Sequence, residues 1–157
     1  MLTWYNKIIY FQGLVMKSKI LVTLQFLSIF LMLIMIEQSS KVFGLGIVIF
    51  IISIIIGLSG IKEHKKDFNI RPDIKEDCIL INTGIYKYIR HPMYFSVVFG
   101  MLGVLIAFFS IKELIVYIFL FIVMIIKLNY EESLWVCHTK EYISYQKQTK
   151  RFIPFVY

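Results

Sequence analysis

A polar cluster between residues 83 and 94 carries side chains of the types that bind charged small molecules. Arg90 supplies a fixed positive charge, and His91 and Tyr94 stand three residues apart. Pro92 lies between them and favours the first turn of a helix, where its missing N–H costs nothing. Side chains three residues apart on that turn are neighbours, and the start of a helix favours an anionic group. The cluster therefore predicts a ligand site at a helix start, with an interfacial belt of aromatic and basic anchors as the alternative.

A second cluster, Lys127, Glu131 and Glu132, directly follows an apolar run. Carboxylates at the edge of a membrane are costly unless they are paired or functional. Adjacent residues of a helix point about 100° apart, so we expect one glutamate to face the first cluster and the other to face water. Because acidic residues oppose the dipole at a helix C-terminus, we expect either that the helix continues past Glu132 or that the pair has a functional role. A solvated helix end is the plainer alternative.

Four apolar runs must position these clusters, and they cover residues 20–36, 42–61, 92–111 and 114–128. A helix needs about 20 apolar residues to cross the hydrocarbon core, and the runs lack the polar–apolar alternation of a barrel strand. We therefore predict an all-α integral membrane protein with about four transmembrane helices. The short polar turns after the first and third runs, with Lys112 and Glu113 in the second turn, predict two hairpins. The whole chain, 1–157, is expected to form one membrane domain.

The distribution of basic residues predicts the orientation. Of the 17 lysines and arginines, only Lys41 and Lys112 lie in the two predicted outer turns. All the others fall in the predicted inner segments, 1–19, 62–91 and 127–157. Lys and Arg are enriched in the cytoplasmic segments of membrane proteins. We therefore predict that the cytoplasmic side of the inner membrane holds both termini, the loop 62–91 and an amphipathic helical tail (129–157). Orientation and anionic lipid account for the net charge of +7, so no nucleic-acid partner is expected.

The remaining polar residues are expected to have structural roles. Gln25 is the strongly polar group of the first run and is expected to hydrogen-bond another helix. His64 stands among charged residues and is expected to be a solvated loop residue. Cys78 and Cys137 lie in predicted cytoplasmic segments, where thiols stay reduced, so no disulfide is expected. His138 beside Cys137 lacks a second pair at ligand spacing, so no metal site is expected.

The motifs together resemble one family of membrane enzymes. Those that carry the resemblance are Gly84-Ile-Tyr, Arg90-His91-Pro92-Met93-Tyr94, Glu131-Glu132, Glu141-Tyr142-x-x-Tyr145 and Arg151-Phe-Ile-Pro154. Over residues 78–155 the chain resembles the isoprenylcysteine carboxyl methyltransferase family and its phospholipid N-methyltransferase relatives. The resemblance implies S-adenosyl-L-methionine (SAM) in a cytoplasmic-side pocket that the loop and the tail close over. It also implies a lipophilic acceptor that enters from the bilayer and is methylated on a carboxylate, as in prenylated cysteine, or on an amine or hydroxyl.

The matching positions imply roles for individual residues. The implied catalytic residues are Arg90, Lys127, Glu131 and Glu132. The implied cofactor contacts are Cys78, Ile79, Leu80, Ile81, Tyr86, His91, Pro92, Met93, Tyr94, Glu131 and Glu132. Lys127 stands about one helical turn before the acidic pair, where eukaryotic members have an arginine that holds the substrate carboxylate. Which glutamate is the family's stays open, because His138-Thr139 replaces the usual Phe-Gly and the spacing that follows is short.

Two other functions stay open. NADPH-dependent sterol-type reductases share the Arg-His-Pro region and a similar tail, although Met93 stands where they typically have Asn. A non-catalytic membrane scaffold would tolerate substitution of His91 and Glu132, which an enzyme would not. An ion path is disfavoured because no charged residue lies in the middle of a run. The sequence predicts no particular oligomeric state.

Overall fold

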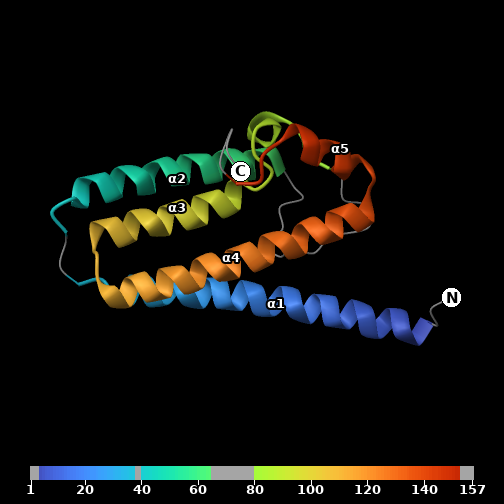
Figure 1. Ribbon diagram of the computed structural model, residues 1–157, viewed down its shortest axis with the longest axis horizontal. Helices are drawn as coiled ribbons and strands as arrows, with labels where there is room; N and C mark the ends of the chain where they lie inside the picture. Colours follow the sequence, from blue (N-terminus) through green and yellow to red (C-terminus); the bar gives the residue numbers. More distant parts are fainter. Residues whose placement is uncertain (1–3, 38–39, 65–79, 153–157) are drawn as a thin grey trace.

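All regular elements in the described part of the chain are helices. The computed structural model describes residues 4–37, 40–64 and 80–152. Its elements in chain order are α1 (Trp4–Ile34), α2 (Phe43–His64), the short 3-10 helix η1 (Gly84–Lys87), α3 (Pro92–Ala107), α4 (Ile111–His138) and α5 (Glu141–Gln148) (Figure 1). Within these residues, extended pairing is limited to one bridge between Ile89 and Lys150. The predicted all-α class is confirmed.

Two helices are long and apolar enough to cross a membrane: α2 over its whole length, and α1 over Val15–Ile34. These correspond to the first two predicted runs, and α3 is a shorter apolar helix. Large apolar side chains of both long helices, such as Phe30 and Ile55, are exposed, as a lipid-facing surface requires. Helix α4 extends far beyond the predicted run 114–128 and ends at His138, which confirms that it continues past the two glutamates.

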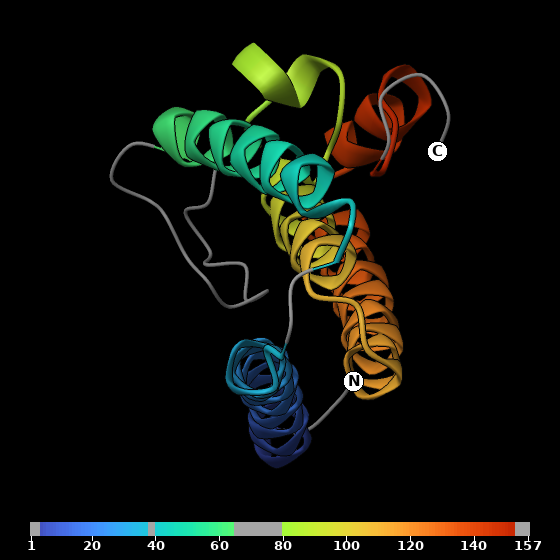
Figure 2. The same cartoon turned by 90° about the vertical axis from the view of Figure 1, so that its left-hand side faces the viewer.

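The helices pack as two pairs that differ from the predicted hairpins. Helix α2 packs along α3, α1 packs along α4, and a smaller α3/α4 contact joins the two pairs. Figure 2 shows α1 set apart from α2 on the far side of the bundle. The prediction of an α1/α2 hairpin is therefore wrong, although α3 and α4 do form one. The physical reason is that the two helices make different contacts. Glycines let α2 pack closely against α3, whereas Gln25 of α1 bonds to Lys127 of α4.

Glycines set the α2/α3 contact. A Cβ atom placed on Gly103 would lie 2.6 Å from the carbonyl oxygen of Gly46 and 2.9 Å from the backbone nitrogen of Phe50. A Cβ atom on Gly46 would lie 2.6 Å from the backbone nitrogen of Ala107. Backbone atoms cannot give way at such distances, so both positions require glycine. The absence of side chains lets the two helix backbones touch, as in close-packed membrane helices.

A hydrogen bond between polar side chains sets the α1/α4 contact instead. The Lys127 ammonium donates to Gln25 Oε1 at 2.7 Å, and both side chains are buried between the helices. This confirms the prediction that Gln25 bonds to another helix. A buried amide and a buried ammonium each need a partner, so the pair fixes α1 against α4 rather than against α2.

The α3/α4 turn lies earlier than predicted. Helix α3 ends at Ala107 rather than at residue 111, and the turn is formed by residues 108–110. Lys112 and Glu113, predicted to be the turn, belong to the first helical turn of α4. Ser110 explains the difference: its Oγ accepts a hydrogen bond from Glu113 N at 3.2 Å and caps the helix.

The bundle therefore has two chemically different ends. The turn end carries the last turn of α1, residues 107–113 and Ser40, which caps α3 by donating to the carbonyl oxygens of Ala107 (backbone N–H, 2.7 Å) and Ile106 (Oγ, 2.6 Å). The site end carries the last turn of α2, all of η1, the start of α3, the last turns of α4, and α5 (Figure 1). Most of the motif residues gather at the site end.

Candidate functional site

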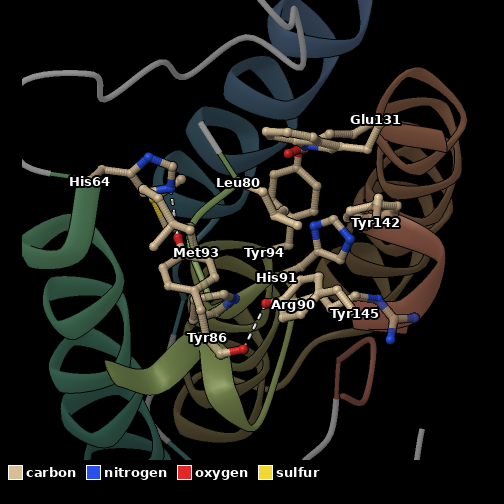
Figure 3. Close-up of a pocket in the computed structure, with 13 residues that line it drawn as sticks. His64, Leu80, Tyr86, Arg90, His91, Met93, Tyr94, Glu131, Tyr142 and Tyr145 are labelled. Carbon is tan, nitrogen blue, oxygen red and sulfur yellow. Dashed lines mark hydrogen bonds between the residues drawn. The ribbon is translucent and has the colours of Figure 1, made fainter. Parts of the chain in front are cut away.

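A pocket at the site end collects the chemistry-bearing residues. The empty space between its walls, taken together with the open solvent at its mouth, is about 640 Å³. Side chains from α2, η1, α3, α4 and α5 line it, together with the segment before η1 (Figure 3). The lining residues are His64, Leu80, Ile81, Tyr86, Arg90, His91, Pro92, Met93, Tyr94, Glu131, Trp135, Tyr142 and Tyr145. Most of its lining is apolar or aromatic, as in small-molecule sites generally.

The turn around Gly84 places Tyr86 in the wall of the pocket. Gly84 opens η1 with φ +54°, a conformation that favours glycine, and an added Cβ would strike the side chain of Glu63. Thr83 Oγ1 donates to Glu63 Oε2 at 2.6 Å and ties the turn to the end of α2. The Tyr86 hydroxyl then meets His64 Nε2 at 2.8 Å (Figure 3). The end of α2 and η1 thus form one side of the pocket.

The segment after α5 pairs with the residues before α3. The backbone N–H of Arg90 donates to Lys150 O at 2.8 Å, and that of Lys150 donates to Tyr88 O at 3.1 Å. The backbone N–H of His91 donates to Arg151 O at 3.2 Å. These bonds seat α5 beside η1, where the Tyr145 hydroxyl donates to Tyr86 O at 2.6 Å.

Glu132 lies behind the pocket wall in a buried cluster of positive charge. Its carboxylate accepts from Arg90 Nε at 2.8 Å, from Arg151 Nη2 at 2.6 Å and from His91 Nε2 at 3.3 Å. Burial alone would raise the pKa of this carboxyl, but the bonds from His91 and Arg90 outweigh it and lower the pKa to about 2. Glu132 therefore joins α4 to the start of α3 and to the C-terminal segment as a permanent anion.

Arg90 is held in the same cluster. Besides Glu132, its guanidinium donates through Nη1 to the carbonyl oxygens of Gln146, at 3.1 Å, and Thr149, at 2.5 Å. These carbonyls belong to the last turn of α5 and the residue that follows it. Arg90 thus binds the end of α5 with one edge, while part of its side chain lines the pocket.

Glu131, the neighbouring glutamate, faces the pocket. Its Oε2 accepts a hydrogen bond from the Tyr94 hydroxyl. The Tyr94 ring is stacked on His91, with centroids 5.3 Å apart and planes 8° apart. Figure 3 shows the His91 and Tyr94 rings side by side and Glu131 above them. The two glutamates have different partners, as expected, but the expectation that one of them faces water is wrong, because Glu132 is buried and bonds to Arg90 and His91.

Aromatic rings complete the pocket. Trp135 stacks on Tyr142 at 5.7 Å between centroids, and Tyr142 contacts Tyr145 at 5.9 Å. Burial raises the pKa of the Tyr86, Tyr142 and Tyr145 hydroxyls above their ordinary value, so all three stay neutral. Neutral aromatic faces around a carboxylate attract cations, and particularly cations that shed water easily.

The structure brings most of the predicted site residues together, and leaves some apart. Leu80, Ile81, Tyr86, Arg90, His91, Pro92, Met93, Tyr94 and Glu131 all line the pocket. Glu132 and Lys127 do not line it: Glu132 lies in the charge cluster, and Lys127 lies beneath Tyr94, with Nζ 4.9 Å from the ring centroid. Cys78 and Ile79 lie outside the described residues.

Sequence reasoning missed part of the lining. His64 was expected in a solvated loop, but it is the last residue of α2 and lines the pocket, so that expectation is wrong. Helix α2 extends one turn beyond the apolar run because Lys62 and His64 suit a helix C-terminus. Trp135 was not singled out. Tyr142 and Tyr145 are three residues apart, and that spacing could have indicated a shared helix face.

Comparison with known protein families identifies one that matches the chain. A family model described as phospholipid methyltransferase matches residues 41–139, more than half of the chain. The chain belongs to the phospholipid methyltransferase family. This family includes proteins related to isoprenylcysteine carboxyl methyltransferase, so the resemblance seen in the motifs is confirmed. No curated protein and no solved structure matches the chain significantly.

The matched region covers α2, η1, α3 and α4, and therefore most of the pocket. Membership of the family indicates a membrane methyltransferase in general terms. Helix α1 and helix α5 lie outside the match, although α5 contributes Tyr142 and Tyr145 to the pocket and α1 contributes the bond from Gln25 to Lys127.

Proposed function

We propose that the protein transfers a methyl group from SAM to a lipophilic acceptor, with the cofactor in the pocket at the site end. The observation that carries the proposal is the Glu131 carboxylate, oriented by Tyr94 and surrounded by aromatic rings, in a chain of a methyltransferase family. Bound SAM would supply an activated methyl group on a sulfonium.

The residues present fit such a cofactor. SAM carries a sulfonium and an ammonium, and the pocket offers one carboxylate and the faces of Tyr86, Tyr142 and Trp135. The anionic end of SAM suits the start of α3, because the dipole of a helix favours an anion at its N-terminus. His91, buried at the N-cap position beside that start, lies in the same wall.

The protein's own residues would act by position and by exclusion of water. Methyl transfer is an in-line displacement that needs no covalent enzyme intermediate, so alignment of the two reactants supplies much of the rate. Tyr94 holds Glu131, His91 stacks on Tyr94, and the cluster around Glu132 holds His91 and Arg90 in turn. The place where the reaction would occur is thus supported first by Tyr94 and His91, and behind them by the cluster around Glu132.

We further propose four membrane spans with the site end in the cytoplasm. The distribution of Lys and Arg supports this orientation, since the turn end carries only Lys41 and Lys112. The third and fourth spans would be α3 and residues 114–128 of α4, which pack between α2 and α1. The pocket then opens at the inner face of the membrane, where a lipid-borne carboxylate, amine or hydroxyl can reach it.

The deciding experiment is binding of radiolabelled SAM to the purified protein in detergent. We expect saturable binding by the wild type and a loss of about tenfold or more in Glu131→Gln, which removes the charge and keeps the shape. Glu141→Gln is the matched control, because it removes the same charge from the exposed start of α5. Equal binding by Glu131→Gln and the wild type would remove Glu131 from the site.

Absence of SAM binding by folded wild-type protein would overturn the cofactor assignment. The same preparation would then be tested with radiolabelled NADPH, the cofactor of the sterol-type reductases that share part of the motif. If SAM binds, transfer of its methyl group into a membrane lipid extract or into a prenylated cysteine analogue identifies the acceptor class.

A further inference from the structure

The two ring nitrogens of His91 have different surroundings. Nε2 lies 3.3 Å from Glu132 Oε1, behind the wall of the pocket, where the two side chains are 5% and 4% exposed. The ring itself lines the pocket and is stacked on Tyr94. The stacking fixes the plane of the imidazole, and the bond to Glu132 fixes its rotation within that plane. His91 is therefore held in one orientation, with one nitrogen turned toward the charge cluster.

The bond to Glu132 decides which nitrogen of His91 carries the hydrogen. The Glu132 carboxylate also accepts from Arg90 and Arg151 and has no proton to give, so the hydrogen of its bond to His91 belongs to Nε2. A neutral imidazole carries a single N–H, and the partner of one nitrogen therefore sets the state of the other. Nδ1 of neutral His91 thus keeps a lone pair.

This lone pair is available to a ligand. His91 is the N-cap residue of α3, yet its side chain makes no cap hydrogen bond. Nδ1 is also not one of the buried polar atoms that lack a partner in the described part of the chain, so it is open to the pocket that His91 lines (Figure 3). His64, the other imidazole in the lining, differs: its Nε2 meets the Tyr86 hydroxyl, which can donate or accept and so does not fix a hydrogen on the ring.

We propose that His91 Nδ1 accepts the proton of the methyl acceptor, and that this acceptor is an amine or a hydroxyl rather than a carboxylate. The inference rests on the proposed function and narrows its substrate class. The N–H or O–H proton of the acceptor passes to Nδ1, and the lone pair so released forms the bond to the methyl carbon. The carbon–sulfur bond breaks with its electron pair on sulfur, and His91 then gives the proton to water. A carboxylate has a free lone pair already and needs no base.

Glu132 suits the proton transfer as well as the orientation. A carboxylate bonded to one nitrogen of an imidazole stabilises the positive charge that forms when the other nitrogen takes up a proton. Imidazole is also the side chain whose basicity best matches neutral pH, which is the condition for efficient general-base catalysis. The pocket thus holds an oriented base whose open nitrogen faces the ligand.

The titratable and charged groups around His91 come from every element of the site. The hydroxyls from η1 and α5 stay neutral because burial raises the pKa of each, and the guanidinium groups stay charged. Imidazoles are the side chains whose charge ordinarily changes between pH 5 and 8, so His64 is the group that a pH profile must separate from His91. The full set is His64, Tyr86, Arg90, Tyr94, Lys127, Glu131, Glu132, Tyr142, Tyr145 and Arg151.

The first test needs no cofactor. The chain has three histidines, so nitrogen NMR of histidine-labelled protein in detergent shows three imidazoles, which His64→Gln and His138→Gln assign. At pH 8 we expect His91 in the form that carries its hydrogen on Nε2, with Nδ1 unprotonated. As the pH falls, Nδ1 should be the nitrogen that gains a proton. A His91 ring with its hydrogen on Nδ1 at pH 8 would overturn the proposal.

The second test is the variant His91→Gln. The glutamine amide keeps an N–H donor for Glu132 and removes the base. At saturating SAM and pH 7, methyl transfer to phosphatidylethanolamine should fall at least about a hundredfold, the usual contribution of a general base. The deficit should shrink toward about pH 10, where the amine loses its proton unaided. His138→Gln is the matched control, since it removes an exposed imidazole from the end of α4 and should change neither value.

The acceptor class is tested with phosphatidylethanolamine, diacylglycerol and a prenylated cysteine analogue, which offer an amine, a hydroxyl and a carboxylate. Transfer to the carboxylate alone, or to none of the three, overturns the proposal. So does a His91→Gln deficit that is the same at pH 7 and pH 10, or a loss of the pH dependence in His64→Gln instead. If folded wild-type protein does not bind SAM, the proposed function fails and the role of His91 with it; if SAM binds and His91→Gln is fully active, only the role of His91 fails.

Discussion

Helix α4 buries one glutamate near each of its ends, and the two carboxylates have opposite surroundings. Glu132, at the site end, accepts bonds from Arg90, Arg151 and His91. Glu113, at the turn end, is fully buried, and neither of its carboxylate oxygens has a hydrogen-bond partner among the described residues. Burial, and then the charge of Glu37, raise the pKa of Glu113 to about 7, whereas the pKa of Glu132 is lowered to about 2.

The difference shows where the fold uses charge. At the site end, buried charges are matched to one another and fix three chain segments around the pocket. At the turn end, backbone caps and glycine contacts already define the structure. Burial of the Glu113 carboxylate there without a hydrogen-bond partner lowers the stability of the fold. The comparison predicts that substitutions at the two ends have effects of different size and, for the two glutamates, of different sign.

The largest effect is expected from Glu132→Ala. It leaves the buried guanidinium of Arg90 and the partly exposed guanidinium of Arg151 without their shared carboxylate. Removing one partner of a buried ion pair costs about 3–5 kcal/mol. The loss should depend on pH. Because the folded pKa of Glu132 is about 2 and the ordinary value is 4.5, its contribution is complete above pH 4.5 and disappears as the pH falls toward 2.

Thermal unfolding in detergent, followed by circular dichroism from pH 2 to pH 7, measures this. The gap between wild type and variant should narrow steadily below pH 4.5. Glu131→Gln is the informative comparison, since it changes the adjacent residue but not the cluster. A stability loss in Glu131→Gln as large as in Glu132→Ala would contradict the separate roles of the two glutamates.

Glu113→Gln is expected to have the opposite sign. The folded pKa of Glu113, about 7, lies above the ordinary value of 4.5, so the folded state holds the proton more tightly and loses stability as the pH rises between those values. An amide, which mimics the protonated acid, should therefore stabilise the protein at pH 8 by about 1–3 kcal/mol. The same unfolding series checks this: the gain should vanish near pH 4.5, and a variant less stable than wild type at pH 8 would refute it.

The positions of the apolar helices were predictable from the sequence, because long uncharged apolar runs are typical of helices that can cross a membrane. The apolar runs predicted the positions of the helices, and the Arg-His-Pro motif predicted a helix start at Pro92. Tyr86, His91 and Tyr94, which the family resemblance implies as cofactor contacts, line one pocket. These features depend on residues that are close in the sequence or that follow a periodic pattern.

The rest depends on contacts between distant residues. Which helix α1 packs against is decided by the bond between Gln25 and Lys127, which are 102 positions apart. Which glutamate faces the pocket is decided by the rotation of α4 against α3, and no local pattern reports that rotation. The role of Arg151 also depends on distant residues. Its carbonyl oxygen accepts from the backbone N–H of His91, and its guanidinium pairs with Glu132.

Ser110→Ala should have a moderate effect confined to the turn end. It removes the side-chain acceptor that caps α4, and the loss of such a cap typically costs about 1 kcal/mol. Ser144→Ala is the matched control, because Ser144 is exposed within α5 and its Oγ only donates to Glu141 O. Denaturant unfolding should separate the two variants, while SAM binding stays unchanged in Ser110→Ala. Equal stability of the two variants would show that the cap contributes nothing.

The smallest effect is expected from Lys112→Met. Lys112 pairs with Glu37 at 3.2 Å, but the two side chains are 70% and 60% exposed, and exposed pairs contribute roughly 0–1 kcal/mol. Arg151→Met removes a shorter pair, 2.6 Å long, whose carboxylate partner is buried. Unfolding of both variants at low and high salt measures the contrast: Lys112→Met should lose what little effect it has as the salt is raised, whereas Arg151→Met should stay destabilised because the buried Glu132 is poorly screened. A Lys112→Met variant as unstable as Arg151→Met would mean that the turn end, too, is organised by charge.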